Sequence, residues 1–146
     1  MSIYTPTIQG IYTARASAVR NASQTIVGRD LIDPANASSI FGTGINPEVS
    51  GLIVYLNVTA APGIETLQLI LEEQDPASLT WSVVGATLVT TTAGMVKLKV
   101  KQSILSIAAS TAGIQLQDTL PYAWRIRIVH SAAGNWTYSL GIVLYN

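Results

Sequence analysis

Residues 95–101 read Met-Val-Lys-Leu-Lys-Val-Lys, and this stretch decides the fold class. In an extended chain Val96, Leu98 and Val100 point to one side, and the lysines between them point to the other. A register slip by one residue would bury three ammonium groups, so the register of such a strand against an apolar core is fixed. The stretch therefore predicts a β-strand with one buried face and one outer face.

Other segments show the same period of two, or the β-branched and aromatic composition of strands. Strands are predicted at 52–59 and 67–72, and the turn at Pro62-Gly63 would join them into a hairpin. Two longer strands are predicted at 122–130 and 136–145, joined by a hairpin loop. The remaining predictions are strands at 18–30, 80–84, 87–91 and 114–117, a bend at Gly85, and a helical turn at 104–108 within the less regular stretch 103–119.

This series of short strands without crossover helices predicts an all-β fold. We expect an antiparallel β-sandwich, a jelly-roll-like fold or a related barrel, formed by a single β domain over residues 16–146. Residues 1–15 are expected to form an extended N-terminal arm. The apolar side chains of this arm need a covering surface, such as a neighbouring subunit. The expected partner-binding residues are Ile3, Tyr4, Ile8, Ile11 and Tyr12.

The composition favours association with other proteins. Of the 146 residues 49% are hydrophobic and only 11% are charged, where soluble domains average about 25% charged residues. So few charges leave apolar groups on the surface, and exposed apolar area is typical of protein interfaces. We therefore expect a homo-oligomer. The formal net charge of zero disfavours binding to nucleic acid or to anionic membranes.

The lack of cysteine excludes several kinds of site, and the lack of a signal or membrane segment indicates the compartment of synthesis. The chain contains no cysteine, so disulfides, thiolate nucleophiles and cysteine-ligated metals are excluded. The first residues lack the basic and apolar segments of a secretory signal, and no apolar run reaches the length of a membrane span. Synthesis in the cytoplasm is the expectation that follows.

The titratable residues suggest no enzyme. His130 is the only histidine, so a catalytic triad or an imidazole metal site would depend on it alone. We expect it to end a strand beside a turn, hydrogen-bonded or solvated. Glu72, Glu73 and Asp75 cluster, but the first two point to opposite faces of a strand, and Asp75-Pro76 is typical of a turn. We expect no catalytic residue, no cofactor and no metal.

A basic face could form if two strands lay side by side. Glu72 or Asp118 could then pair across strands with the basic residues, and such an outer strand surface is preferred over a phosphate-binding one. The residues of this face would be Lys97, Lys99, Lys101, Arg125 and Arg127.

Two segments carry a resemblance to a known family. Segment 51–81 combines a strand, a Pro-Gly turn, a second strand and Glu-Glu-Gln-Asp-Pro ahead of Leu-Thr-Trp, and segment 120–141 begins Leu-Pro-Tyr-Ala-Trp-Arg-Ile-Arg-Ile. Both resemble small virion proteins of tailed bacteriophages, most of all the capsid decoration (cement) proteins of long-tailed phages infecting thermophilic bacteria. The resemblance implies a homotrimer that binds the major capsid protein on the outer capsid surface and stabilises the shell. Placement on the tail or on a head fibre stays open.

The main alternative is a carbohydrate-binding jelly-roll module or a receptor-binding component of a tail or head fibre. Trp124 and Trp136 share the phase of apolar neighbours and are expected in the core. An exposed Trp81 beside amide side chains would favour sugar stacking, whereas buried tryptophans and an apolar subunit interface would favour a decoration protein.

Overall fold

The segment with alternating lysines forms the strand that its pattern predicts. In the computed structural model, which describes residues 8–28, 50–121 and 123–145, it is strand β6 (Gly94–Val100). Its three inward residues are buried, and Lys97 and Lys99 lie on the outer side. The other strands of the described residues are β1 (Ile8–Arg20), β2 (Gln24–Val27), β3 (Gly51–Ala60), β4 (Leu67–Gln74), β5 (Trp81–Ala86), β7 (Ile107–Ser110), β8 (Gly113–Leu116), β9 (Trp124–His130) and β10 (Trp136–Tyr145).

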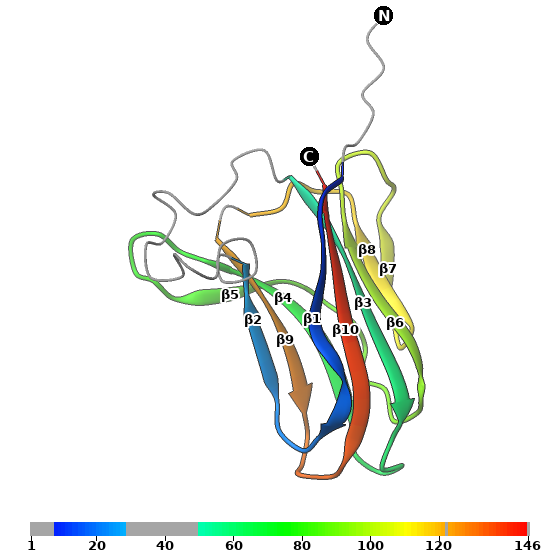
Figure 1. The fold of residues 1–146 in the computed structure, drawn as a ribbon. Coiled ribbons are helices and arrows are strands. Elements are labelled where there is room, and N and C mark those ends of the chain that lie inside the picture. Colours follow the sequence, from blue (N-terminus) through cyan, green and yellow to red (C-terminus); the bar gives the residue numbers. More distant parts are fainter. Residues whose placement is uncertain (1–7, 29–49, 122, 146) are drawn as a thin grey trace, which may run out of the picture.

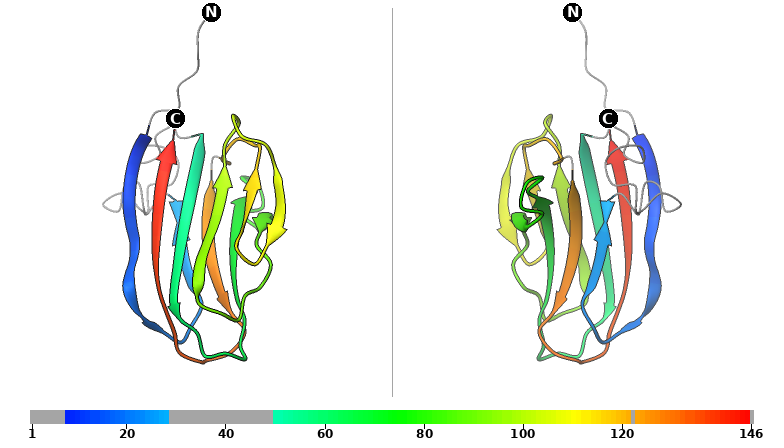
Figure 2. Two further views of the ribbon diagram at one scale, coloured as in Figure 1. Left: turned by 90° about the vertical axis from the view of Figure 1, so that its right-hand side faces the viewer. Right: turned by 90° about the vertical axis from the view of Figure 1, so that its left-hand side faces the viewer.

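The strands form two sheets packed face to face, as Figures 1 and 2 show. The six-stranded sheet has the order β1-β10-β3-β6-β8-β7, and the four-stranded sheet has the order β2-β9-β4-β5. Neighbouring strands are antiparallel, with the exception of β6 and β8, which are parallel. The all-β sandwich expected from the sequence is confirmed.

The strand pairs are nested along the chain. β1 pairs with β10, β2 with β9, β3 with β6 and β4 with β5. Successive pairs alternate between the two sheets. This is the topology of a jelly roll, in which one long hairpin wraps into a double sheet. The short β7–β8 hairpin is added to the larger sheet beside β6.

The core lies between the sheets and is filled by the inward residues of each alternation. Along β10, buried and half-buried side chains alternate over the whole strand. Trp124 and Trp136 belong to the same core cluster as the inward residues of β3, β4, β6, β9 and β10, as expected. Burying each large apolar side chain contributes about 1.5 to 3 kcal/mol. The period of two is therefore the pattern that stabilises the fold.

Both predicted hairpins are wrong. β3 and β4 lie in different sheets, and so do β9 and β10. Their connections meet at one end of the sandwich, where Thr66 and Ser131 form two hydrogen bonds and the Gly134 amide donates to Glu65 at 2.8 Å. Alternation specifies which face of a strand is buried, but it does not specify the strand's neighbour. A turn between two apolar strands therefore fits a connection between sheets as well as a hairpin.

Several local predictions are corrected. The helical turn expected at 104–108 does not form, and strand β7 begins at Ile107, whereas the short strand expected at 114–117 is confirmed as β8. The segment 87–91 is not a strand, although Thr87 and Thr90 form hydrogen bonds with β4. Its Leu88 amide instead donates to the Ser110 carbonyl of β7, so this segment crosses from one sheet to the other.

The first described strand occupies part of the expected arm. β1 pairs with β10 from Ile8, opposite Tyr145, to Arg20, opposite Trp136. Residues 8–15 therefore form an edge strand of this chain's own sheet, and the boundary expected between residues 15 and 16 lies inside β1. Residues 1–7 lie outside the described residues. Register shifts interrupt the β1–β10 pairing, and such bulges protect edge strands from pairing with other chains.

Two glycines allow close approach beside the β7–β8 hairpin. A side chain at Gly85 of β5 would lie 2.6 Å from Leu116 of β8, so this glycine lets the two sheets meet at their edge. A side chain at Gly113 would collide with the carbonyl oxygen of Lys97, and its φ of 154° also disfavours other residues. Gly113 is therefore required for the parallel pairing of β8 with β6.

Candidate functional site

The residues expected to bind a partner through the arm do not share one environment. Ile3 and Tyr4 lie outside the described residues. Ile8 begins β1, while Ile11 is 74% exposed and Tyr12 packs against the core cluster. Of the expected arm residues whose side chains are described, Ile11 is the one that presents an apolar group to solvent.

The six-stranded sheet has a basic outer face. Its cations are Lys97 and Lys99 of β6 and Lys101 just after it, and the strands of this sheet carry no carboxylate. Lys97 Nζ lies 5.7 Å from the centre of the Tyr55 ring, and Lys101 Nζ lies 4.1 Å from that of Tyr145. Within the described part of the chain, neither lysine forms an ion pair. This face thus combines positive charge with aromatic and aliphatic groups.

A hollow of about 180 Å³ opens on the same face between β6, β8 and β7. Lys97 and Lys99 line it from β6, and Ile107, which is 59% exposed, lines it from β7. Gly113 and Gln115 of β8 lie between them. Cavities of about 150 Å³ bind benzene, so this hollow has room for one apolar side chain.

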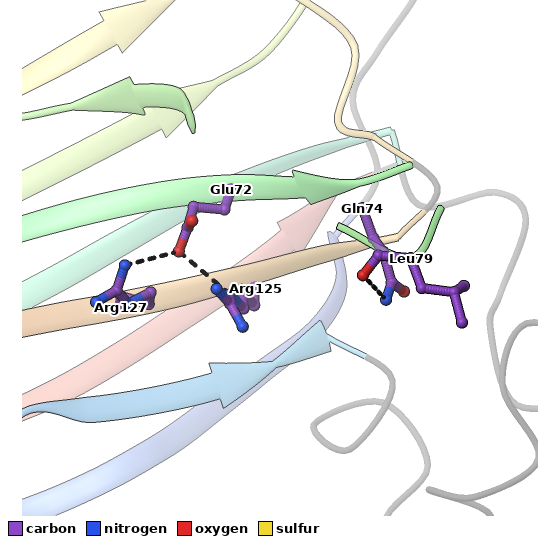
Figure 3. A network of polar contacts seen from close by, with 5 residues as sticks. All are labelled: Glu72, Gln74, Leu79, Arg125 and Arg127. Carbon is purple, nitrogen blue, oxygen red and sulfur yellow. Dashed lines mark hydrogen bonds and ion pairs between the residues drawn. The ribbon is translucent and has the colours of Figure 1, made fainter. Parts of the chain in front are cut away.

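The four-stranded sheet pairs the charged side chains of its outer face with one another (Figure 3). Glu72 Oε1 accepts hydrogen bonds from Arg125 Nε at 3.2 Å and from Arg127 Nη1 at 3.3 Å. The carboxylate is covered, since Glu72 is only 5% exposed. Arg125 also stacks on Trp81, with Cζ 4.3 Å from the ring centre. One face of this indole is therefore occupied by the protein itself.

The single basic face considered from the sequence does not form. The lysines lie on the six-stranded sheet, whereas Arg125 and Arg127 lie on the four-stranded one. Glu72 is confirmed as the cross-strand partner of both arginines. Asp118 instead accepts the backbone amide of Thr119 at 2.7 Å.

His130 lies in the seam between the sheets. Its Nε2 is 2.9 Å from Tyr138 Oη, which joins β9 to β10, so the expected hydrogen-bonded histidine is confirmed. Arg20 stacks on the Tyr138 ring at 5.0 Å. Burial lowers the pKa of His130, against the attraction of Glu65 and with the repulsion of Arg20, and burial raises the pKa of Tyr138 to about 12. His130 Nδ1 and Trp136 Nε1 are buried without a hydrogen-bond partner among the described residues.

The turn between β4 and β5, residues 75–80, is held by its own hydrogen bonds. The Asp75 carboxylate accepts the Ala77 amide and the Ser78 hydroxyl, each at 2.8 Å. These bonds hold the pKa of Asp75 below its usual value. The Asp75 amide donates to the Thr80 carbonyl at 2.9 Å. The turn expected at Asp75-Pro76 is confirmed, and its backbone is fixed at both ends.

Leu79 is the unusual residue of this 75–80 turn. Its φ is 61°, and no other non-glycine residue in the described ranges has a positive φ. Its amide donates to the Asp75 carbonyl at 2.8 Å, and its carbonyl accepts Gln74 Nε2 at 3.0 Å (Figure 3). The side chain is 61% exposed. A left-handed conformation costs such a residue about 1 to 2 kcal/mol, and strain of this kind gathers at functional sites.

No metal site or membrane span is found in the part of the chain that the structure describes. No group of three or more histidine, aspartate or glutamate side chains there could hold a metal ion. No helix there is both long and apolar enough to cross a membrane. The candidate functional features described above are surfaces, namely the hollow, the basic face around it and the 75–80 turn.

Sequence reasoning missed both Leu79 and Ile107. Leu79 carries a weak signal, because a large aliphatic residue stands inside a run of turn residues between Ser78 and Thr80. Ile107 carries none, since the segment around it was expected to be helical and its outward direction depends on the pairing of β7 with β8.

No protein-family model matches the chain, and no curated protein matches it significantly. The function is therefore inferred from the surfaces described above and from the resemblance carried by the sequence.

Proposed function

We propose that this chain is a virion structural protein, a decoration protein that binds the outside of a tailed-phage capsid as a homotrimer and stabilises the shell. Its partners are other copies of the chain and the major capsid protein. The resemblance of segments 51–81 and 120–141 to decoration proteins supports this proposal. The apolar surface of the sandwich supports it independently.

The exposed apolar side chains are the observation that carries the proposal. Ten large apolar residues in the described ranges are at least 43% exposed. With 11% charged residues in the whole chain, few charged groups are available to keep such surfaces apart. Burial against protein neighbours removes this area from water. The ten residues are Ile11, Val19, Ile64, Leu79, Val83, Leu88, Val89, Met95, Leu105 and Ile107.

Binding to capsid shells tests the proposal directly. Purified shells assembled without this chain are mixed with the full-length protein and sedimented. We expect saturable retention of the protein on the shells, together with a higher temperature of shell disruption. Protein that stays in the supernatant at every concentration contradicts the proposal.

A carbohydrate-binding module or fibre tip is the second candidate, because Trp81 is only half-buried and lies opposite Gln74 in the β4–β5 pair. Two contacts count against it. Arg125 covers one face of the indole, and the Gln74 amide is already bonded to the Leu79 carbonyl. Binding of the full-length chain to glycans that is lost in Trp81→Ala would favour this candidate over the decoration protein.

A further inference from the structure

We propose that the chain assembles head to tail, with Leu79 of one copy seated in the hollow between β6, β8 and β7 of the next copy. This inference rests on the proposed homo-oligomer and assigns its contact. It joins the most strained exposed apolar side chain of the described residues to a hollow of matching size and complementary charge.

The 75–80 turn is built as a rigid projection. Its two ends are joined by the bond from the Asp75 amide to the Thr80 carbonyl, and the Asp75 carboxylate fixes its interior. The Gln74 side chain then holds the Leu79 carbonyl (Figure 3). A contact residue that is already ordered loses little conformational entropy on binding. Leu79 is thus presented in one orientation in the free chain.

The hollow suits a leucine side chain. Its volume is about 180 Å³, and Ile107 supplies an apolar wall that is 59% exposed in the single chain. Gly113 lines the hollow as well, and it lets β8 lie close to β6, because a side chain there would meet the Lys97 carbonyl oxygen. A leucine placed there would bury both itself and Ile107.

The charges beside the two elements are complementary. Glu73 and Asp75 are exposed next to the 75–80 turn, and hydrogen bonds to Ala77 and Ser78 favour the ionised form of Asp75. Lys97 and Lys99 line the hollow. Opposite charges around an apolar contact fix its orientation and disfavour like-charged alternatives. A second copy of this chain therefore supplies both the leucine and the carboxylates that the hollow fits.

The projection and the hollow lie on different parts of the molecule. The β4–β5 connection stands out on the side of the four-stranded sheet, whereas β7 and β8 lie on the opposite side (Figure 1). A contact between two different surfaces is heterologous, so each copy can give its turn to one neighbour and its hollow to another. Such contacts close into a ring when the rotation between copies allows it, and a trimer is one such ring.

Mixing two variants tests this arrangement. Leu79→Asp removes the apolar side chain of the 75–80 turn and leaves the hollow unchanged. Ile107→Asp changes the wall of the hollow and leaves the turn unchanged. Each variant alone should associate at least about tenfold more weakly than the wild type, because the apolar contact between Leu79 and Ile107 is lost. An equal mixture should form a heterodimer of twice the chain mass in sedimentation velocity, since one intact contact is restored.

Two further variants separate this contact from general effects. Leu79→Gly keeps the positive φ and removes the side chain, so association should weaken while the thermal stability of the single chain is kept or raised. Ala133→Asp places a charge at an exposed position in the connection between β9 and β10, which lies at the opposite end of β4 from the 75–80 turn, and should associate like the wild type.

The failures of the two proposals are distinguishable. If the wild type binds shells as an oligomer and Leu79→Asp does so equally well, the contact is wrong and the proposed function stands. A mixture that stays monomeric, although each variant is folded and the wild type is oligomeric, also overturns the contact. A wild type that is monomeric and does not bind shells overturns the proposed function.

Discussion

The two outer faces of the sandwich differ in whether their charged side chains form ion pairs within the part of the chain that the structure describes. On the four-stranded sheet, Arg125 and Arg127 share the covered carboxylate of Glu72, so both cations have a partner within the face. On the six-stranded sheet, Lys97 and Lys99 border an open hollow and form no ion pair with a described residue. The two faces therefore differ in their ion pairs. The arginines of the four-stranded sheet have a partner in the same chain, whereas the lysines of the six-stranded sheet are available to a second protein. Changes on the first should alter folding, and changes on the second should alter association.

Gly113→Ala should have the largest effect on stability, because it disrupts the pairing of β8 with β6 beneath the basic face. The new methyl group meets the Lys97 carbonyl oxygen and must also adopt an unfavourable φ. We expect a loss of about 3 kcal/mol in the free energy of unfolding and faster amide exchange over β7 and β8. Urea unfolding and hydrogen exchange measure both.

Gly63→Ala is the matched control for strain without collision. Gly63 has a φ of 99° and no atom within 4 Å of the position that a side chain would take. This variant should lose only about 1 kcal/mol. Equal losses in the two variants would show that the contact of Gly113 with β6 contributes nothing.

Glu72→Gln should have the next largest effect. It keeps the volume of the side chain and leaves two partly buried guanidinium groups without their carboxylate, so we expect a loss of about 2 kcal/mol in urea unfolding. Glu73→Gln is the control one residue away, at an exposed position, and should change the stability by less than about 0.5 kcal/mol. If both variants unfold alike, the four-stranded face is not stabilised by its own charges.

The seam that joins the two sheets should make stability depend on pH. The pKa of His130 is lowered in the folded chain, so the unfolded chain binds the proton first as the pH falls below 6.5. The contribution of His130 is therefore fully present above pH 6.5 and is lost as the pH falls through its folded pKa. Tyr138, with a pKa raised to about 12, has the opposite sign and costs stability as the pH rises above 10.

The variant His130→Gln tests the part of the pH dependence that lies below pH 6.5. It keeps a hydrogen-bonding group near Tyr138 but does not titrate. Between about pH 7.5 and about pH 5 the wild type should lose more free energy of unfolding than this variant does. Parallel pH profiles would show that His130 titrates alike in the folded and unfolded chain. His130 lies in the seam and on neither outer face, so this pH dependence is separate from the effects of changing Glu72 or the lysines.

The double change Lys97→Gln with Lys99→Gln should have the smallest effect on folding. Both side chains point away from the core, so the free energy of unfolding should change by less than about 0.5 kcal/mol. Association should nevertheless weaken, because the charges beside the hollow are gone. A large loss of stability with unchanged association would reverse the assignment of the two faces.

The fold was predictable from the sequence to the extent that alternation controls it. The lysine alternation of β6 and the long alternation of β10 identify strands and their buried faces, because a one-residue shift would exchange core and surface. Pairing was not predictable in the same way. The nested jelly-roll order sends β3 and β4 to different sheets, and neither strand carries a local signal of its partner.

The candidate site was less predictable, because it depends on long-range placement. The arm residues chosen from their apolar pattern include Tyr12, which packs against the core cluster. The hollow needs β8 to lie parallel to β6 with β7 outside it, and only this order brings Ile107 near Lys97 and Lys99. A backbone φ such as that of Leu79 depends on the bonds of the finished turn.

The mass of the full-length chain in solution tests the central claim most directly, namely that this protein acts by associating through its apolar surfaces. Sedimentation velocity at about micromolar concentration should give three times the 15.5 kDa of one chain, with the same assembly retained on capsid shells. A monomer at all concentrations, without retention on shells, would contradict the account.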